Sequence, residues 1–209
     1  MGRKPRELTA IPLSGERGAA QTALLARDPA ARVSLDDPDP VGRLLGALRR
    51  AGAQDQAAAL LARDLTAHVA LDDPDAVGRL LGVLREAGAR EQATGLAARA
   101  AAYAALDAPY AVDHLLEVLQ ETGARDQAAV LAARAAAHAA LTNSDAVDHL
   151  LRTLREGGAA GHVETLIGRL PAEGQFALYC EKADGRPQYR LGREPDGKPA
   201  SPWSWDDLG

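Results

Sequence analysis

The sequence predicts an all-α fold: an α-solenoid of about four two-helix repeats, followed by a small C-terminal β-hairpin cap. One observation is repetition, because "LDDPDAVGRLLGVLREAGAREQA" at residues 71–93 has close copies before and after it. Another is the period, since two separate columns of residues recur every 35–36 positions. These columns are Val41, Val77, Val112 and Val147, and Gln21, Gln56, Gln92 and Gln127. Within each copy the apolar residues fall at helical spacing, so the repeated unit is a pair of helices.

The first helix of each unit is short and amphipathic. In the first copy its apolar stripe consists of Val41, Leu44, Leu45 and Leu48. Asp37 is placed to cap the helix start, and Pro38 suits the first turn, where no backbone N–H is needed. Gly52 marks the end, because glycine adopts the left-handed conformation at low cost. The third copy has Ala108 in place of the capping aspartate, and the fourth has Asn143.

The second helix is longer and rich in alanine, as in "DQAAVLAARAAAHAAL" at 126–141. Its apolar residues lie on two faces, which suits a helix that packs between neighbours in a stack. At the front of the chain a second helix is expected without its first, and Pro29 interrupts it. The expected organisation is a flexible N-terminal segment at 1–17, a helical array at 18–171 and a distinct C-terminal part at 172–209.

The C-terminal part has a different character from the array. The stretch "FALYCEKADGRPQYRLGRE" contains two strand-like runs around an Asp184-Gly185 turn, which predicts a β-hairpin. A tail with Trp203 and Trp205 follows. Two interpretations remain open: the hairpin and indoles cover the end of the stack, or the tail is a docking peptide.

The two-helix unit resembles the tetratricopeptide class. The resemblance rests on the Leu-Gly pair in "LLGAL" and "LLGVL" and on the proline after the second helix. Later copies carry Glu117 and Arg152 in place of that glycine, and the usual aromatic positions are absent. The chain, with its ending "YRLGREPDGKPASPWSWDDL", also resembles alanine-rich helical-repeat proteins of actinobacteria. These resemblances imply architecture and no activity.

Composition argues against several classes of function. The formal net charge is −5, so no overall basic field attracts nucleic acid. Cys180 is the single cysteine, which rules out an intramolecular disulfide. The start of the sequence lacks the apolar core of a signal peptide, and no apolar run reaches membrane-spanning length. A soluble, cytoplasmic protein is expected.

No motif indicates catalysis, a metal or a cofactor. His114 and His149 occupy equivalent positions in adjacent repeats, roughly 10 Å apart or more, which is too far to share one zinc ion. The "DDPD" turns lack the ligand order of an EF-hand, and helix capping explains them. We therefore expect a protein that is not an enzyme and needs no cofactor.

The function expected is non-catalytic protein–protein interaction, with a protein or peptide as partner and with neither nucleic acid nor a membrane. The candidate surface lies on the short helices opposite the leucine stripe, with the tail as a second candidate. Its residues are Arg43, Arg50, Arg79, Val83, Glu86, His114, Val118, Glu121, His149 and Glu156, together with Trp203 and Trp205. An alternative is a detached sensor or scaffold region of a larger protein. A nucleic-acid-binding repeat is third, because the acidic charge opposes it.

A further column of arginines recurs on the second helices, at Arg63, Arg99, Arg134 and Arg169. Such a ladder can bind carboxylates or phosphates. The favoured interpretation is that each stem covers the stack while its head group pairs with a nearby Asp or Glu.

Overall fold

The computed structural model describes residues 29–183, 198 and 200, and within them the structure is all-α, without a strand. The first helices of the units are α3 (Pro38–Arg50), α6 (Pro74–Glu86), α8 (Pro109–Glu121) and α10 (Ser144–Glu156). The second helices are α4 (Gln54–Leu61) with α5 (Leu65–His68), α7 (Arg90–Tyr103), α9 (Arg125–His138) and α11 (Ala160–Arg169). The short α2 (Pro29–Arg32) precedes them, and α12 (Phe176–Lys182) follows. The expected N-terminal segment at 1–17 lies outside the described residues.

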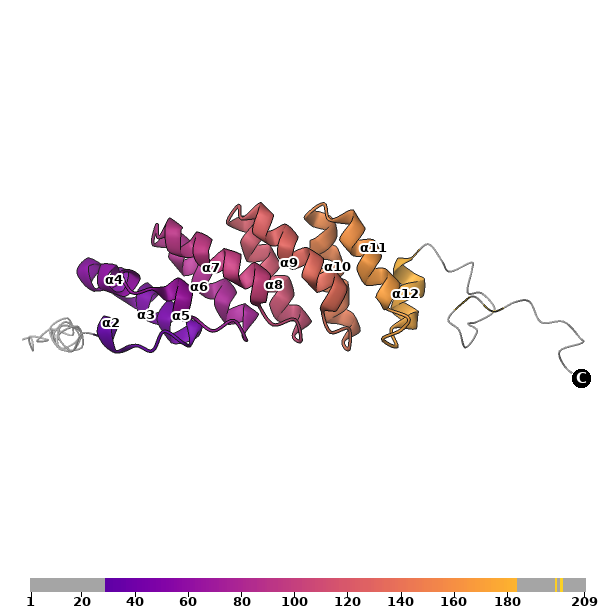
Figure 1. The fold of residues 1–209 in the computed structure, drawn as a ribbon, viewed down its shortest axis with the longest axis horizontal. Helices are drawn as coiled ribbons and strands as arrows, with labels where there is room; N and C mark the ends of the chain where they lie inside the picture. Colours follow the sequence, from indigo (N-terminus) through magenta and orange to yellow (C-terminus); the bar gives the residue numbers. More distant parts are fainter. Residues whose placement is uncertain (1–28, 184–197, 199, 201–209) are drawn as a thin grey trace, which may run out of the picture.

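The helices form two rows that run along the long axis of the molecule (Figure 1). In the first row α3 contacts α6, α6 contacts α8, and α8 contacts α10. In the second row α5 contacts α7, α7 contacts α9, and α9 contacts α11. Each first helix also packs against the second helix of its own unit. Each of these helices thus contacts its counterpart in the neighbouring unit as well as its partner in the same unit.

Local signals in the sequence explain where the first-row helices begin and end. The Asp73 carboxylate accepts hydrogen bonds from the backbone N–H groups of Asp75 and Ala76, both at 3.0 Å. Asn143 caps α10 in the same way, whereas Ala108 gives α8 no side-chain cap. The glycines of the turns have positive φ angles of 69–78°: Gly52, Gly88, Gly123 and Gly158. The predicted caps and stops are thus confirmed.

The core is a continuous cluster of leucine, valine and alanine between the two rows. Leu80, Leu115 and Leu150 are fully buried. Their counterpart Leu44 is only half-buried, because no described first-row helix precedes α3. The leucine stripe therefore contacts both the partner helix and the neighbouring unit.

One second helix is broken, contrary to the expectation of a continuous one. The chain has one more residue between Gln56 and Val77 than between the matching Gln and Val of later copies. The structure accommodates this residue by ending α4 at Leu61 and starting α5 at Leu65, which is fully buried. Asp64 caps the new start by accepting from the N–H of Ala67 at 3.1 Å.

Backbone hydrogen bonds connect the linkers of successive units. Each linker carbonyl accepts from an N–H in the next linker: Asp36 from Ala70 at 2.8 Å, Leu71 from Ala105 at 3.1 Å and Leu106 from Ala140 at 3.0 Å. After the last unit, the Gln175 side-chain amide donates to the Leu141 carbonyl at 2.9 Å. We call this series the linker ladder.

The first strand of the predicted hairpin is wrong, because residues 176–182 form helix α12. Phe176 and Tyr179 are three residues apart and stack with ring centroids 6.2 Å apart, as neighbours on one helical face do. Leu178 is buried, and Lys182 Nζ lies 2.5 Å from Asp148 on α10. A helix lets these side chains contact the end of the array together. The predicted Asp184-Gly185 turn and second strand lie outside the described residues.

Candidate functional site

The accessible side of the first row is formed by four positions on each helix, at i, i+4, i+7 and i+11; none of them is buried. We call this surface the first-row face. Its residues are Asp39, Arg43, Gly46 and Arg50 on α3; Asp75, Arg79, Gly82 and Glu86 on α6; Tyr110, His114, Glu117 and Glu121 on α8; and Asp145, His149, Arg152 and Glu156 on α10. All the predicted arginine, histidine and glutamate residues of the candidate surface lie on it.

The two apolar residues of the candidate surface, Val83 and Val118, lie less open than expected. Val83 and Val118 are half-buried against the core, and Thr153 is only 1% exposed. The reason is that these positions face the adjacent first-row helix: a Cβ built on Gly78 would lie 3.6 Å from the Val118 side chain. The accessible column is one residue earlier, at Gly46, Gly82, Glu117 and Arg152.

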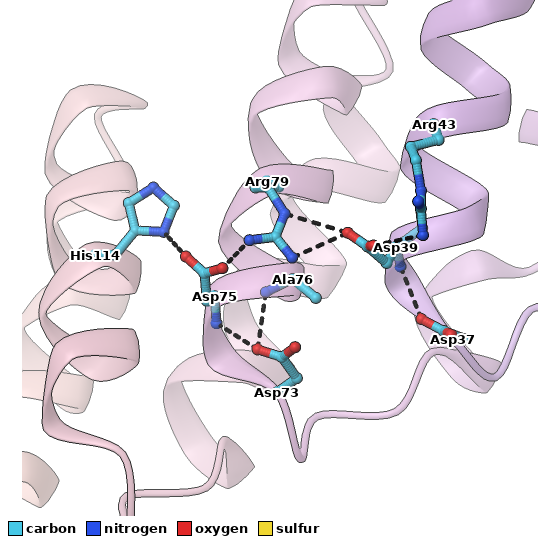
Figure 2. A network of polar contacts seen from close by, with 8 residues as sticks. All are labelled: Asp37, Asp39, Arg43, Asp73, Asp75, Ala76, Arg79 and His114. Atoms are coloured by element: carbon cyan, nitrogen blue, oxygen red, sulfur yellow. Dashed lines mark hydrogen bonds and ion pairs between the residues drawn. The ribbon is translucent and has the colours of Figure 1, made fainter.

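A chain of polar contacts crosses the first-row face from α3 to α8 (Figure 2). Asp39 lies 2.6 Å from Arg43 of its own helix and 2.9 Å from Arg79 of the next. Arg79 also pairs with Asp75 on α6. Nδ1 of His114 on α8 then lies 2.7 Å from the Asp75 carboxylate, at ion-pair distance but without hydrogen-bond geometry. Two of the predicted binding cations, Arg43 and Arg79, are therefore already paired with carboxylates within the fold.

The pattern changes between α8 and α10. Tyr110 occupies the position of Asp39 and Asp75, and its ring centroid lies 5.7 Å from that of His149. Nδ1 of His149 accepts from the Arg152 guanidinium at 2.6 Å. Here an aromatic contact replaces the carboxylate that links the earlier units.

Two glycines on the first-row face have no packing role among the described residues. A Cβ built on Gly46 or Gly82 would meet no atom within 4 Å. By contrast, Gly42 and Gly78 lie at helix–helix contacts, with neighbouring side chains 3.8 and 3.4 Å from the built Cβ. Gly46 and Gly82 thus leave helical backbone uncovered at a cost of about 1 kcal/mol each relative to alanine.

Gly46 opens a groove between α3 and α6. A hollow of about 230 Å³ has Pro38, Gly42, Leu80 and Val83 as its apolar lining, with Asp39, Arg43 and Arg79 at its edge. A second hollow of about 670 Å³ adjoins it between α3 and α4 and includes Arg49 and Glu86; α4 contributes Gln54, Ala57, Ala58 and Leu61 to its lining. Both hollows are lined by Gly46 and Arg50, and we call them together the α3–α6 groove.

The charge of this groove is mostly positive. It contains four arginines but only two acidic residues, Asp39 and Glu86. Arg49 pairs with Glu86 at 3.3 Å. The Nε of Arg50 donates to the Gly46 carbonyl at 3.2 Å, and no acidic partner of Arg50 occurs among the described residues. The Arg50 guanidinium is therefore the cation of this groove with capacity left for a carboxylate.

The second-row arginines have a structural role, and the expected pairing with acidic side chains is not their main contact. Arg134 donates to the carbonyls of Ala101 and Ala104, both at 2.9 Å. Arg169 does the same to Ala136 and Ala139, at 3.1 and 2.8 Å, and lies a looser 3.6 Å from Glu173. Arg63 likewise donates to the carbonyls of Ala30 on α2 and of Val33 just after it, and Arg99 donates to the carbonyl of Thr66 on α5. Carbonyls at helix ends lack intrahelical donors, so these guanidinium groups cap each preceding helix.

The acidic turns also act within the fold. The Asp37 carboxylate accepts from the N–H of Asp39 at 3.0 Å, consistent with capping. Hydrogen bonds from the Thr66 hydroxyl and the Ala67 amide lower the pKa of Asp64. In the part of the chain that the structure describes, no group of three or more His, Cys, Asp or Glu side chains is placed to hold a metal ion.

Sequence reasoning missed two features of this surface. The "DDPD" motif predicts turns that include Asp39 and Asp75, although each of them precedes an arginine by four residues, a spacing that indicates a helical ion pair. In the sequence, Gly46 stands out only as part of the Leu-Gly motif "LLGAL". No sequence signal separates a glycine that permits packing, such as Gly42, from one that leaves a surface open.

The chain has no significant match among protein-family models, curated proteins or solved structures. The resemblances to tetratricopeptide and actinobacterial repeat proteins therefore stay predictions. None of the described helices is both long enough and apolar enough to cross a membrane. Trp203 and Trp205 lie outside the described residues, so the structure does not place them.

Proposed function

We propose that this chain is a non-catalytic interaction protein, in which helical hairpins stack as an α-solenoid and the α3–α6 groove binds a short segment of a protein partner. One observation carries the proposal: Gly46 opens an apolar hollow next to Arg50, which has no acidic partner among the described residues. An alanine at position 46 would favour the helix and would meet no neighbour. A bound segment supplies the contact that the chain itself does not make.

The chemistry of the groove specifies the bound segment. Leu80 and Val83 line the hollow and favour an apolar side chain. Arg50 favours a carboxylate beside it, because a guanidinium binds carboxylates with charge-assisted hydrogen bonds. Arg43 and Arg79 contribute less, since Asp39 and Asp75 already oppose their charge. We infer that the partner segment combines aromatic or aliphatic residues with Asp or Glu.

Selection of binding peptides from a random library tests whether the groove prefers apolar residues next to acidic ones. The wild-type chain is expected to enrich peptides in which a large apolar residue lies next to acidic residues. The Gly46→Leu and Arg50→Glu variants are expected to lose these peptides, because one fills the groove and the other reverses its charge. Gly82→Leu is the matched control, since position 82 is equally open but does not line the groove. Enrichment of basic peptides, or equal binding to all four proteins, contradicts the proposal.

A further inference from the structure

The sequence itself contains a segment with the chemistry that the α3–α6 groove favours. Residues 203–208, WSWDDL, combine two indoles and a leucine with two aspartates and no basic residue. The groove offers two adjoining hollows and an excess of two positive charges, from four arginines against two acids. The segment is acidic and the groove is mostly positive, so their charges are of opposite sign.

The spacing within this segment also suits two hollows. In an extended peptide, side chains two residues apart point to the same side. A bound WSWDDL segment in that conformation directs Trp203 and Trp205 together toward the apolar lining. Asp206 and Asp207 then follow within reach of a guanidinium such as that of Arg50.

The groove and the start of the C-terminal part lie at opposite ends of the helical rows. The groove is formed by α3, α4 and the facing side of α6, whereas α12, after which the tail continues, contacts α11 and pairs with Asp148 on α10 (Figure 1). This separation favours a second molecule as the place where the segment binds. A contact between different surfaces of two copies is heterologous, and each added copy leaves one groove and one segment free.

We propose that residues 203–208 of one molecule bind the α3–α6 groove of a second molecule, so that the protein associates head to tail. The inference rests on the proposed function, because it names an occupant of the same groove. The indoles lie in the hollows, and the two aspartates face the arginines. Raising the salt concentration weakens the association, because salt screens exposed charges.

Tryptophan fluorescence tests this directly in the full chain, because Trp203 and Trp205 are its only two tryptophans. As the protein concentration rises, the emission maximum is expected to shift to shorter wavelength and acrylamide quenching to fall. The average mass from light scattering is expected to rise in parallel. Gly46→Leu should abolish all three changes, and Gly82→Leu should retain them. Thermal unfolding of both variants checks that they are folded.

Mixing two defective variants gives a sharper test. Gly46→Leu has a blocked groove and an intact tail, whereas the double variant Trp203→Ala, Trp205→Ala has an open groove and no tryptophan. Neither is expected to associate alone. Together they should form a one-to-one dimer and nothing larger, and the emission, which comes only from the Gly46→Leu chain, should shift to shorter wavelength.

Several outcomes overturn the inference. A wild-type emission that matches the urea-unfolded chain at every concentration shows that the segment is not bound. A shifted emission that does not depend on concentration assigns the segment to its own molecule. Association that Gly46→Leu does not change places the contact elsewhere. If the peptide selection succeeds while self-association fails, only this inference is lost; if both fail, the proposed function is lost as well.

Discussion

Arg134 on α9 donates a hydrogen bond to the carbonyl of Ala104, the C-cap residue of α7, at 2.9 Å. The two residues belong to different units, so the contact joins one hairpin to the next. It also gives the end of α7 a positive partner, which complements the negative end of the helix dipole. The packing of α9 against α7 includes this contact.

We expect Arg134→Ala to lower the free energy of unfolding by about 1.5–3 kcal/mol, because it removes charge-assisted hydrogen bonds to part-buried carbonyls. Arg79→Ala is the comparison, since its ion pairs are exposed and worth about 0–1 kcal/mol. Urea unfolding followed by circular dichroism measures both. Equal losses for the two variants would show that Arg134 does not cap α7.

Glycine to alanine substitutions should have opposite effects at two kinds of position. Gly46→Ala is expected to stabilise the chain by about 1 kcal/mol, since the site is helical and open. Gly88→Ala should destabilise it by about 1–2 kcal/mol, because φ is 72° there. Thermal unfolding at one pH ranks the variants, and a destabilising Gly46→Ala would mean that position 46 is crowded within the chain.

Thr153 is a buried polar residue whose hydroxyl has no hydrogen-bond partner in the structure. The same position is valine in the two preceding units, at Val83 and Val118. We expect Thr153→Val to raise the free energy of unfolding by about 1–3 kcal/mol, because it removes an unsatisfied buried group without changing the shape. Thr153→Ser is the control and should destabilise, since it keeps the hydroxyl and loses a methyl group. Stabilisation by serine would contradict this account.

The docking of α12 should depend on the charge of Lys182. Hydrogen bonds to Asp148 and Glu181 raise the pKa of Lys182 above its ordinary value. The pKa of Lys182 is therefore higher in the folded chain than in the unfolded chain. The stability that the protonated Lys182 contributes is complete below the unfolded pKa of about 10.4, and it is lost as the pH rises through the folded pKa. Asp148→Asn should weaken the docking of α12 at neutral pH and reduce its loss at alkaline pH. Hydrogen exchange of the α12 amides near neutral pH, followed by alkaline unfolding curves, checks both effects; identical curves for the two proteins would contradict the assignment.

Much of the fold was predictable because local and long-range signals agree in each copy. Asp73 caps α6, Gly88 ends it, and Leu80 is buried as its helical spacing indicates. The α4–α5 break was not predicted, although the additional residue is visible in the sequence. An inserted residue can be accommodated by a helical bulge, by a loop, or by ending the helix and beginning a new one. Here the burial of Leu65 and the cap from Asp64 favour a new helix.

The candidate surface was predictable in part. Helical periodicity placed Arg43, Arg79 and His114 on one accessible face. Helical periodicity did not show that Asp39 lies beside Arg79 or that Asp75 lies beside His114. These contacts between helices depend on how far α6 and α8 are rotated against their neighbours. For the same reason Val83 and Val118 were expected to be more open than they are. At the C-terminus, the alternation of Phe176 and Leu178 suits a strand, whereas the contacts with the array favour a helix.

The linker ladder bears on how such a chain grows. Its backbone bonds join residues 34 positions apart: Asp36 to Ala70, Leu71 to Ala105 and Leu106 to Ala140. Every internal unit thus contributes one acceptor to its successor and one donor to its predecessor. An in-frame duplication of a whole unit brings both groups with it and leaves no linker amide or carbonyl of the series unmatched. Internal duplication of the gene therefore leaves no backbone group of these linkers without a hydrogen-bond partner. The number of units can change while the hydrogen bonds between successive linkers stay the same.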